Sequence, residues 1–143
     1  DRATGDVRAR HAPLRGTDVT PDEIPGLVDE VPVLAVAAAY AEGPTRFLGA
    51  GELRVKESDR ISTVASELRA MGARVEPLPD SLVVVGGGPL HAGAVDAHGD
   101  HRIAMAGAVA ALAADGATAI DGWEVVATSY PGFERDLESL TRS

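Results

Sequence analysis

The sequence has no cysteine among its 143 residues. Disulfide bonds, thiolate metal sites and cysteine nucleophiles are therefore excluded within it. It also lacks an initiator methionine, a positively charged leader and any long apolar run, so we expect neither a signal peptide nor a membrane span. We interpret the chain as a piece of a longer one, and a cytoplasmic location is the default expectation.

Positively charged residues are scarce. Lys and Arg number 13 against 22 Asp and Glu, which gives a formal net charge of −9. Nucleic acids and anionic membranes are bound largely through Lys and Arg, so this balance argues against both as partners. Small anionic ligands are compatible with it where the few cations are concentrated. The candidates for such a site are Arg46, Arg54, Lys56, Arg60 and Arg102. The alternative is that these are solvated surface charges.

The hydrophobic content is sufficient for one folded domain. Hydrophobic residues make up 45% of the chain, and a chain of this length buries roughly two-thirds of its unfolded surface. Alternating polar and apolar residues predict a short strand pair over residues 6–10 and 16–19. An Ala-rich helix is predicted over Asp29–Ala41, with Pro32 in its first turn. It is apolar nearly all round, so we expect it to be buried.

The rest of the chain alternates predicted strands and helices. The strands are expected at residues 45–48, 74–76, 81–85, 94–97 and 118–121. The helices are expected at residues 58–71, 103–114 and 132–140. The order repeats as two similar units of about 55 residues each. The fold class is therefore α/β, with the Ala-rich faces hidden between the units.

A densely charged segment, Glu52 to Arg60, precedes the second predicted helix. Six of its nine residues are ionisable. Lys56, Glu57 and Arg60 stand at the predicted helix start, a place that suits anions and proton transfer. On a helix, Lys56 can face an anion while Glu57 reaches a reacting carbon, and Arg60 can bind carboxylate or phosphate through two N–H groups. The alternative is an exposed helix start with weak ion pairs.

Asp29 stands near the start of the Ala-rich helix and is interpreted first as its cap. A carboxylate held by helix N–H groups has a low pKa, so it is a weak base unless nearby cations activate a substrate hydroxyl. Asp29 can also hold and orient that hydroxyl.

A second polar stretch, His98-Gly-Asp-His-Arg102, leads into the next helix, with Asp100 as its expected cap. Its histidines and aspartate are ligand types for a divalent metal, but a glycine-containing loop alone fixes no coordination geometry. The other interpretation, which we favour, makes Arg102 an anion clamp at a helix start. The three glycines at 86–88 lack the Lys-Ser/Thr of a phosphate loop and predict a turn.

Four motifs in order resemble one family closely. They are Ile24-Pro-Gly-Leu-Val-Asp-Glu-Val-Pro-Val-Leu34, Leu53-Arg-Val-Lys-Glu-Ser-Asp-Arg-Ile61, Asp100-His-Arg-Ile-Ala-Met105 and Thr128-Ser-Tyr-Pro-Gly-Phe133. The family is 5-enolpyruvylshikimate-3-phosphate (EPSP) synthase. The second motif favours it over its relative, UDP-N-acetylglucosamine enolpyruvyl transferase.

The resemblance implies a fold and a domain organisation. Family members have two domains, each assembled from three βαβαββ-type units in an inverse α/β barrel, with the active site between the domains. They are much longer than this chain. Residues 1–143 therefore resemble part of the C-terminal domain, with about two units present and no counterpart of the N-terminal domain. Little or no activity is expected of this part alone.

The resemblance also implies a reaction. Family members transfer the enolpyruvyl group of phosphoenolpyruvate to the 5-hydroxyl of shikimate 3-phosphate and release phosphate, a step in chorismate and aromatic amino acid biosynthesis. Asp29 matches the aspartate that binds the shikimate hydroxyls and accepts a proton. Glu57 matches the glutamate that transfers a proton at the enolpyruvyl methylene carbon.

Further matches concern substrate binding. Lys56 matches a lysine at the shikimate phosphate, and Arg60 and Arg102 match arginines that grip phosphoenolpyruvate. His101 neighbours the second arginine, and Thr128 stands where some members carry a lysine that contacts phosphoenolpyruvate. No metal or organic cofactor is implied.

Two alternatives stay open. One is enolpyruvyl transfer to another acceptor, such as UDP-N-acetylglucosamine, and the other is a non-catalytic domain that binds anions. In the favoured interpretation the partners are small anionic substrates and the missing N-terminal domain, with neither nucleic acid nor membrane.

Overall fold

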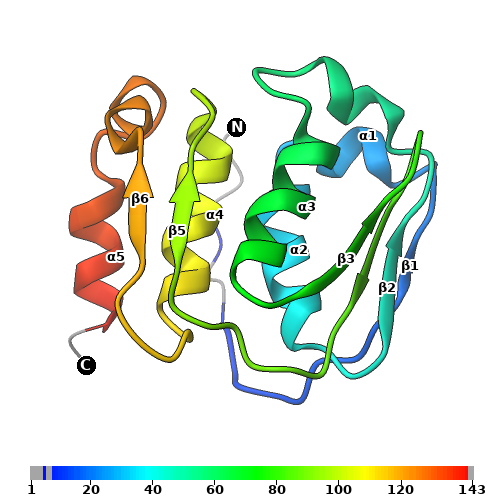
Figure 1. Ribbon diagram of the computed structural model, residues 1–143, viewed down its shortest axis with the longest axis horizontal. Coiled ribbons are helices and arrows are strands. Elements are labelled where there is room, and N and C mark those ends of the chain that lie inside the picture. The colour runs from blue at the N-terminus through cyan, green and yellow to red at the C-terminus, as the bar shows by residue number, and fades with distance from the viewer. Residues whose placement is uncertain (1–4, 6–7, 142–143) are drawn as a thin grey trace.

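The structure, a computed structural model, describes residue 5 and residues 8–141. Two α/β units lie side by side in it (Figure 1). The first contains a four-stranded sheet and the second a two-stranded sheet. The expected α/β class with two units is confirmed, although only the first unit has the full set of elements.

The first unit follows the order β, α, β, α, β, β. Its strands are β1 (Asp18–Val19), β2 (Pro44–Phe47), β3 (Arg74–Pro77) and β4 (Leu82–Val85). Its helices are α1 (Ile24–Leu27), α2 (Val31–Tyr40) and α3 (Arg60–Ala70), with a 3₁₀-helix η1 (Gly51–Val55) before α3. The sheet order is β1-β2-β4-β3, with β1 parallel to β2 and the other pairs antiparallel. The strands expected at residues 74–76 and 81–85 are thus confirmed as β3 and β4, which form an antiparallel hairpin.

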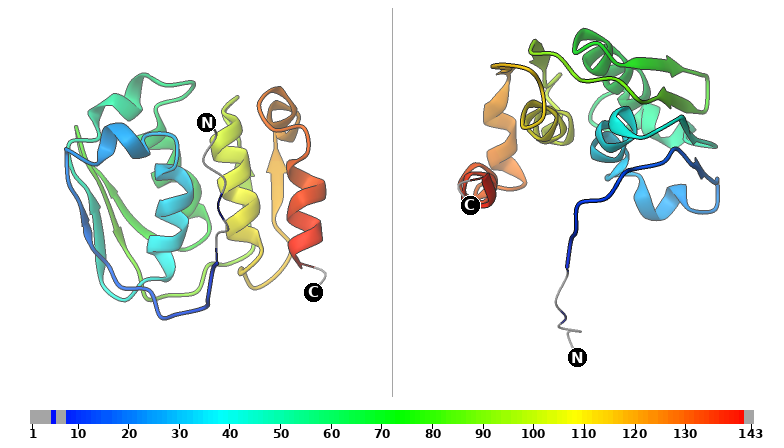
Figure 2. Two further views of the ribbon diagram at one scale, coloured as in Figure 1. Left: turned by 180° about the vertical axis from the view of Figure 1, so that it is seen from behind. Right: turned by 90° about the horizontal axis from the view of Figure 1, so that it is seen from below.

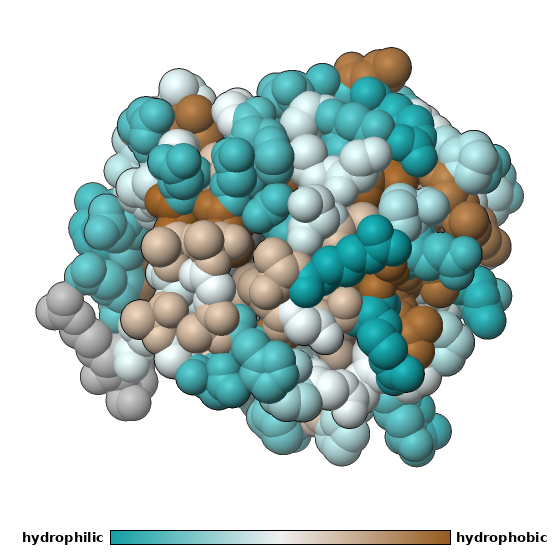
Figure 3. Space-filling view, viewed as in Figure 1, coloured by the Kyte–Doolittle hydropathy of each residue, from teal (hydrophilic) through white to brown (hydrophobic). Residues whose placement is uncertain are grey.

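The second unit has the order β, α, β, α. It consists of β5 (Ala94–Asp96), α4 (His101–Ala111), β6 (Ala119–Asp121), the 3₁₀-helix η2 (Trp123–Thr128) and α5 (Phe133–Thr141). β5 and β6 pair in parallel. Figure 3 shows moderately hydrophobic residues (tan) over the lower part of these two strands, consistent with the exposed alanines of this sheet, Ala94 and Ala119.

The core lies between the helices and the four-stranded sheet. α2 has no polar side chain except Tyr40 and buries most of its residues, as its sequence predicts. It packs on β4 and against α4. Close approach to the sheet requires glycine at position 86, because a Cβ there would meet the carbonyl oxygens of Ala38 and Ala41. The triple glycine therefore ends β4 beneath the helix, and is no phosphate loop.

Three helices begin at one end of the molecule. α2, α3 and α4 all start at the upper end in Figure 1, and Figure 2 shows them nearly end-on from below. Their unpaired N-terminal N–H groups and positive dipole ends therefore share one edge. The motifs at residues 24–34, 53–61 and 100–105 contribute the starts of these helices. None of the described helices is long and apolar enough to cross a membrane.

The strand pair expected before residue 20 is wrong. Residues 6 and 7 lie outside the described residues, and residues 8–10 form no strand. Residues 8–15 are all exposed, so a strand there would bury no side chain. Asp18–Val19 forms a strand and pairs with β2, and Arg15 makes only an isolated bridge to Glu42. The sequence also gave no prediction of α1, η1 or η2.

Candidate functional site

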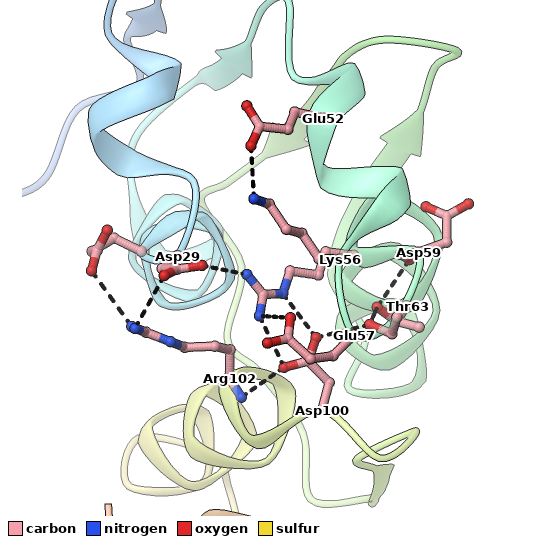
Figure 4. Close-up of polar contacts among 11 residues, drawn as sticks. Asp29, Glu52, Lys56, Glu57, Asp59, Thr63, Asp100 and Arg102 are labelled. Atoms are coloured by element: carbon pink, nitrogen blue, oxygen red, sulfur yellow. Dashed lines mark hydrogen bonds and ion pairs between the residues drawn. The ribbon is translucent and has the colours of Figure 1, made fainter. Parts of the chain in front are cut away.

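Arg60 is the centre of the site. It is the first residue of α3, and its side chain is only 1% exposed. Its Nη1 donates to Asp29 Oδ1 at 2.7 Å, its Nη2 to Glu57 Oε2 at 2.6 Å and its Nε to Asp100 Oδ2 at 2.8 Å. Burial alone would lower the pKa of the guanidinium, but the hydrogen bonds that it donates to Asp100 and Asp29 outweigh burial and leave that pKa raised. Three segments of the chain thus converge on one fixed cation (Figure 4).

Asp100 is the buried anchor of this cluster. Its side chain is fully buried, and it caps α4 by accepting a hydrogen bond from the Arg102 backbone N–H at 2.9 Å. The Ser58 hydroxyl donates to the same carboxylate at 3.0 Å. Burial would raise the pKa of Asp100, but the bonds from Arg60 and from the Arg102 N–H outweigh it, so this pKa is lowered. The predicted cap is confirmed, and the bond to Arg60 is an addition that the sequence did not indicate.

Asp29 is not a helix cap, which corrects the expectation from the sequence. α2 begins two residues later, and its N-cap, Glu30, makes no side-chain cap hydrogen bond. Asp29 lies in the turn before α2, where its carboxylate contacts Arg60 and, at 3.4 Å, Arg102 Nη2. The partners of Asp29 are thus two guanidinium groups and not the N–H groups of the helix. The Arg60 hydrogen bond is the main cause that lowers the pKa of Asp29, whose side chain is half exposed.

Lys56 and Glu57 precede the helix and do not lie on it. The N-cap of α3 is Asp59, and Lys56 has an extended backbone at the end of η1. The expected helical divergence of the two side chains is therefore wrong, since extended backbone separates them instead. Lys56 Nζ pairs with Glu52 Oε1 at 2.7 Å, and the Glu57 side chain is half exposed beside Arg60. Both side chains nevertheless lie beside the carboxylates and guanidinium groups of the site (Figure 4).

Arg102 and His101 lie in the first turn of α4. Arg102 Nη1 lies 3.5 Å from Glu30 Oε1, and the buried Nε of Arg102 has no hydrogen-bond partner. His101 is half-buried. Arg102 and Asp29 share a pocket of about 230 Å³. The pocket is lined by Asp29, Val33, Arg102, Met105, Ala106, Val109, Tyr130 and Phe133.

Thr128 ends η2, outside this pocket. Its hydroxyl donates to the Val125 carbonyl at 2.6 Å and is exposed. Tyr130, two residues later, lines the pocket instead. Its place in the fourth motif was the available signal, but the sequence did not mark it as a site residue.

Two of the candidate cations belong elsewhere. Arg46 pairs with the exposed Asp18 across β1 and β2. Arg54 donates hydrogen bonds to the carbonyl oxygens of Leu78 and Pro79 and to the Asp59 carboxylate. It thereby joins η1 to the β3–β4 hairpin. Of the five candidates, Lys56, Arg60 and Arg102 lie close enough to Asp29 to lower its pKa, and Figure 4 shows Lys56 and Arg102 near Asp29.

The histidine loop has no metal geometry. Among the described residues, no three His, Cys, Asp or Glu side chains are arranged to hold a metal ion. His98 Nε2 lies 3.0 Å from Glu67 Oε1, and Asp100 is committed to Arg60 and the cap. The side chains of His98 and Asp100 are thus engaged by different partners and not by a common metal site.

The arrangement combines anion binding with acid/base groups. Arg60 and Arg102 stand where the helix starts add positive potential. Asp29 and Glu57 occupy the outer N–H groups of Arg60 and are both half exposed. An incoming carboxylate or phosphate can therefore replace them on the guanidinium and leave them beside it.

The chain is similar in sequence to proteins of one family. The chain matches the family "EPSP synthase (3-phosphoshikimate 1-carboxyvinyltransferase)" over residues 2–137. The 3-phosphoshikimate 1-carboxyvinyltransferase of Synechococcus sp. (strain JA-3-3Ab) is 54% identical over 136 residues, 95% of this chain and 31% of the relative. The protein of that name from Herpetosiphon aurantiacus is 57% identical over 90% of this chain and 30% of its own length.

The chain also resembles a solved structure. An EPSP synthase from Acinetobacter baumannii superposes with a TM-score of 0.83 at 43% identity, over 86% of this chain and 29% of that one. The chain thus spans about a third of the length of the relatives that it matches. It belongs to the EPSP synthase family.

Proposed function

We propose that the full-length protein carrying this chain transfers the enolpyruvyl group of phosphoenolpyruvate to the 5-hydroxyl of shikimate 3-phosphate, with release of phosphate. The observation that carries the proposal is a buried arginine, Arg60, whose outer N–H groups are held by two half-exposed carboxylates, Asp29 and Glu57. Such a unit binds an anion and provides acid/base groups beside it. The names of the relatives supply the reaction.

In this proposal, Arg60 and Arg102 bind phosphoenolpyruvate. A planar guanidinium pairs with carboxylate or phosphate through two N–H groups, and the starts of α3 and α4 add favourable potential. Lys56 is assigned to the phosphate of shikimate 3-phosphate, and His101 and Thr128 are assigned as further substrate contacts. Several cations are needed because two phosphates and a carboxylate must be held together against their repulsion.

Asp29 and Glu57 are assigned to proton transfer. The 5-hydroxyl oxygen bonds to C2 of phosphoenolpyruvate while its proton passes to Asp29, and Glu57 delivers a proton to C3. The tetrahedral intermediate then loses phosphate from C2 with the electrons of the broken C–O bond, while Glu57, now deprotonated, takes a proton back from C3. This restores the carbon–carbon double bond in the enol ether. Positioned acid/base groups of this kind contribute about 100-fold to 10,000-fold each to the rate.

Substrate binding also explains how Asp29 becomes a useful base. In the free chain, the Arg60 hydrogen bond keeps the pKa of Asp29 low. When the substrate anion takes the Arg60 N–H group, that hydrogen bond is lost, so the pKa of Asp29 rises toward its ordinary value. Binding of phosphoenolpyruvate thereby prepares the carboxylate to accept a proton.

The proposal includes the missing part of the protein. Because this chain spans about 31% of the Synechococcus relative, we assign it to the C-terminal domain, with the other wall of the cleft supplied by an N-terminal domain. Little activity is expected from the 143 residues alone. A cytoplasmic location is part of the same proposal.

The test is a phosphate-release assay of the full-length protein with phosphoenolpyruvate and either shikimate 3-phosphate or UDP-N-acetylglucosamine. Release only with shikimate 3-phosphate is the expected result. Release only with UDP-N-acetylglucosamine would assign another acceptor. Binding of phosphoenolpyruvate without release in either case would leave an anion-binding protein and overturn the proposal.

A further inference from the structure

We propose that Asp100 is a positioning residue that sets both phosphoenolpyruvate-binding arginines at once. It accepts hydrogen bonds from the side chain of Arg60, on α3, and from the backbone N–H of Arg102, on α4, and unlike Asp29 it is fully buried between them. This inference rests on the proposed function, which assigns the two arginines to one substrate.

The contact with Arg60 fixes the orientation of the guanidinium. Asp100 accepts from Nε at 2.8 Å and from Nη2 at 3.3 Å, a two-point contact along one edge of the planar group. The two side chains are 1% and 0% exposed, so water does not compete for these bonds. With its inner edge held in this way, Arg60 presents its outer N–H groups toward Asp29 and Glu57 (Figure 4).

The contact with Arg102 fixes a helix start. The Asp100 side chain accepts from the Arg102 backbone N–H and so sets where α4 begins. The Arg102 side chain leaves this turn toward Asp29. Since one carboxylate makes both contacts, a displacement of Asp100 alters the spacing between Arg60 and Arg102.

The negative charge of Asp100 is not needed for its role as a helix cap. Asparagine caps helices about as well as aspartate, and burial of a carboxylate is costly unless it is paired and hydrogen-bonded. The buried charge has its counterpart in the guanidinium, and the Ser58 hydroxyl satisfies a further acceptor position. Orientation of Arg60 is therefore the property that Asp100→Asn removes, while the cap is retained.

The test compares full-length proteins carrying Asp100→Asn and Asp59→Asn. Asp59 is the matched control, because it caps α3 through the Ser62 N–H and pairs with an arginine, Arg54, outside the cluster. In Asp100→Asn, an amide N–H₂ opposes the N–H groups of Arg60. A misplacement of about 1 Å can reduce turnover by about 100-fold. We expect kcat/KM for phosphoenolpyruvate to fall by about this factor, while the KM for shikimate 3-phosphate changes less than about threefold.

The control and a milder variant make the test more specific. Asp59→Asn should change neither kcat/KM for phosphoenolpyruvate nor the KM for shikimate 3-phosphate. Ser58→Ala retains the Asp100 charge but removes one of its hydrogen bonds, and we expect a smaller rise, about fivefold, in the KM for phosphoenolpyruvate alone. If Asp100→Asn does not fold, the Ser58→Ala result decides the inference.

Three results would overturn the inference. The first is an Asp100→Asn variant with unchanged kinetic constants, and the second is an equal fall in kcat/KM for both substrates. The third is a lower melting temperature with normal kinetic constants. Each of these results is what a purely structural residue would give. A wild-type protein that releases no phosphate would instead overturn the proposed function. A crystal structure of the Asp100→Asn variant would then test the inference. Compared with the wild type, the Arg60 guanidinium should have rotated or moved away from Asp29.

Discussion

The buried Arg60 guanidinium and the half-exposed Asp29 carboxylate are joined by a 2.7 Å ion pair between residues 31 positions apart. The two partners differ in freedom, because Arg60 is held on its inner edge by Asp100 whereas Asp29 faces solvent. In the proposed function, an incoming anion replaces the carboxylate and leaves the arginine in place, so Asp29 is the partner that we expect to respond to substrate.

Asp29→Asn tests the assignment of Asp29 as proton acceptor. Asparagine retains an oxygen for Arg60 but has no basic carboxylate, so we expect kcat to fall by about 100-fold to 10,000-fold in the full-length protein. The measurement is phosphate release at saturating concentrations of both substrates. Asp18→Asn, which removes the partner of the exposed Arg46, is the control and should leave kcat unchanged. A normal kcat in Asp29→Asn would remove Asp29 from the mechanism.

Glu57→Gln tests the second proton transfer. A neutral amide holds Arg60 Nη2 no more tightly than the carboxylate that the anion replaces, so the KM for phosphoenolpyruvate should not rise, whereas kcat falls by about 100-fold or more. In deuterated water, incorporation of deuterium at C3 of the substrate should decrease with kcat. Glu76→Gln, on the exposed side of β3, is the matched control. Unchanged deuterium incorporation in Glu57→Gln would assign the proton to another group.

Much of the fold follows from local sequence pattern. The three-and-four spacing of apolar residues predicted α3, and the helix is observed with the same buried face. The hairpin of β3 and β4 followed from two apolar runs around a Pro-Asp turn. These elements bury one face each, so the pattern alone specifies them.

The first strand and the exact helix starts depend on tertiary partners. β1 has two residues and exists because β2 is beside it, which no local pattern indicates. The role of Asp29 likewise depends on Arg60 and Arg102, which contact its carboxylate and come from later segments. Asp100 was predicted as a cap because that role is local, while its pairing with Arg60 joins residues 40 positions apart.

Arg60→Lys tests the need for a planar cation. Lysine retains the charge, but its three N–H donors on one nitrogen cannot reproduce the four hydrogen bonds that the planar guanidinium makes to Asp100, Asp29 and Glu57. Hydrogen bonds to charged groups are worth about 1.5–3 kcal/mol each. We expect the KM for phosphoenolpyruvate to rise by about 10-fold to 100-fold. Arg46→Lys, at an exposed ion pair, should leave it unchanged. Equal behaviour of the two variants would contradict the assignment of Arg60 to substrate binding.

The stability of the protein should depend on acidic pH through Asp29 and Asp100. Both have lowered pKa values in the fold, while an unfolded aspartate titrates near about 3.9. Their contribution is therefore present above about pH 4 and is lost as the pH falls toward the lowered folded values, because the unfolded chain binds protons first. We expect the thermal unfolding midpoint to decline from about pH 4 downward.

Asp100→Asn separates this contribution from general acid denaturation. The variant should begin with a lower unfolding midpoint at pH 7, since Arg60 has lost a charged partner, and then decline less than the wild type between about pH 4 and pH 3. Circular dichroism melts at several pH values measure both quantities. Parallel declines in the two proteins would mean that Asp100 titrates normally in the fold.

Gly86→Ala tests the packing of α2 on the sheet, which supports the turn that carries Asp29. A Cβ at position 86 would lie against the backbone carbonyls of Ala38 and Ala41, which cannot move without shifting the helix. Overpacking of this kind costs about 1–3 kcal/mol, so the thermal midpoint should fall by several degrees. Gly88→Ala is the control, because no atom lies within 4 Å of a Cβ at that position. Its midpoint should stay the same or rise slightly, since alanine restricts the unfolded chain. Equal midpoints for the two variants would show that α2 tolerates displacement from β4.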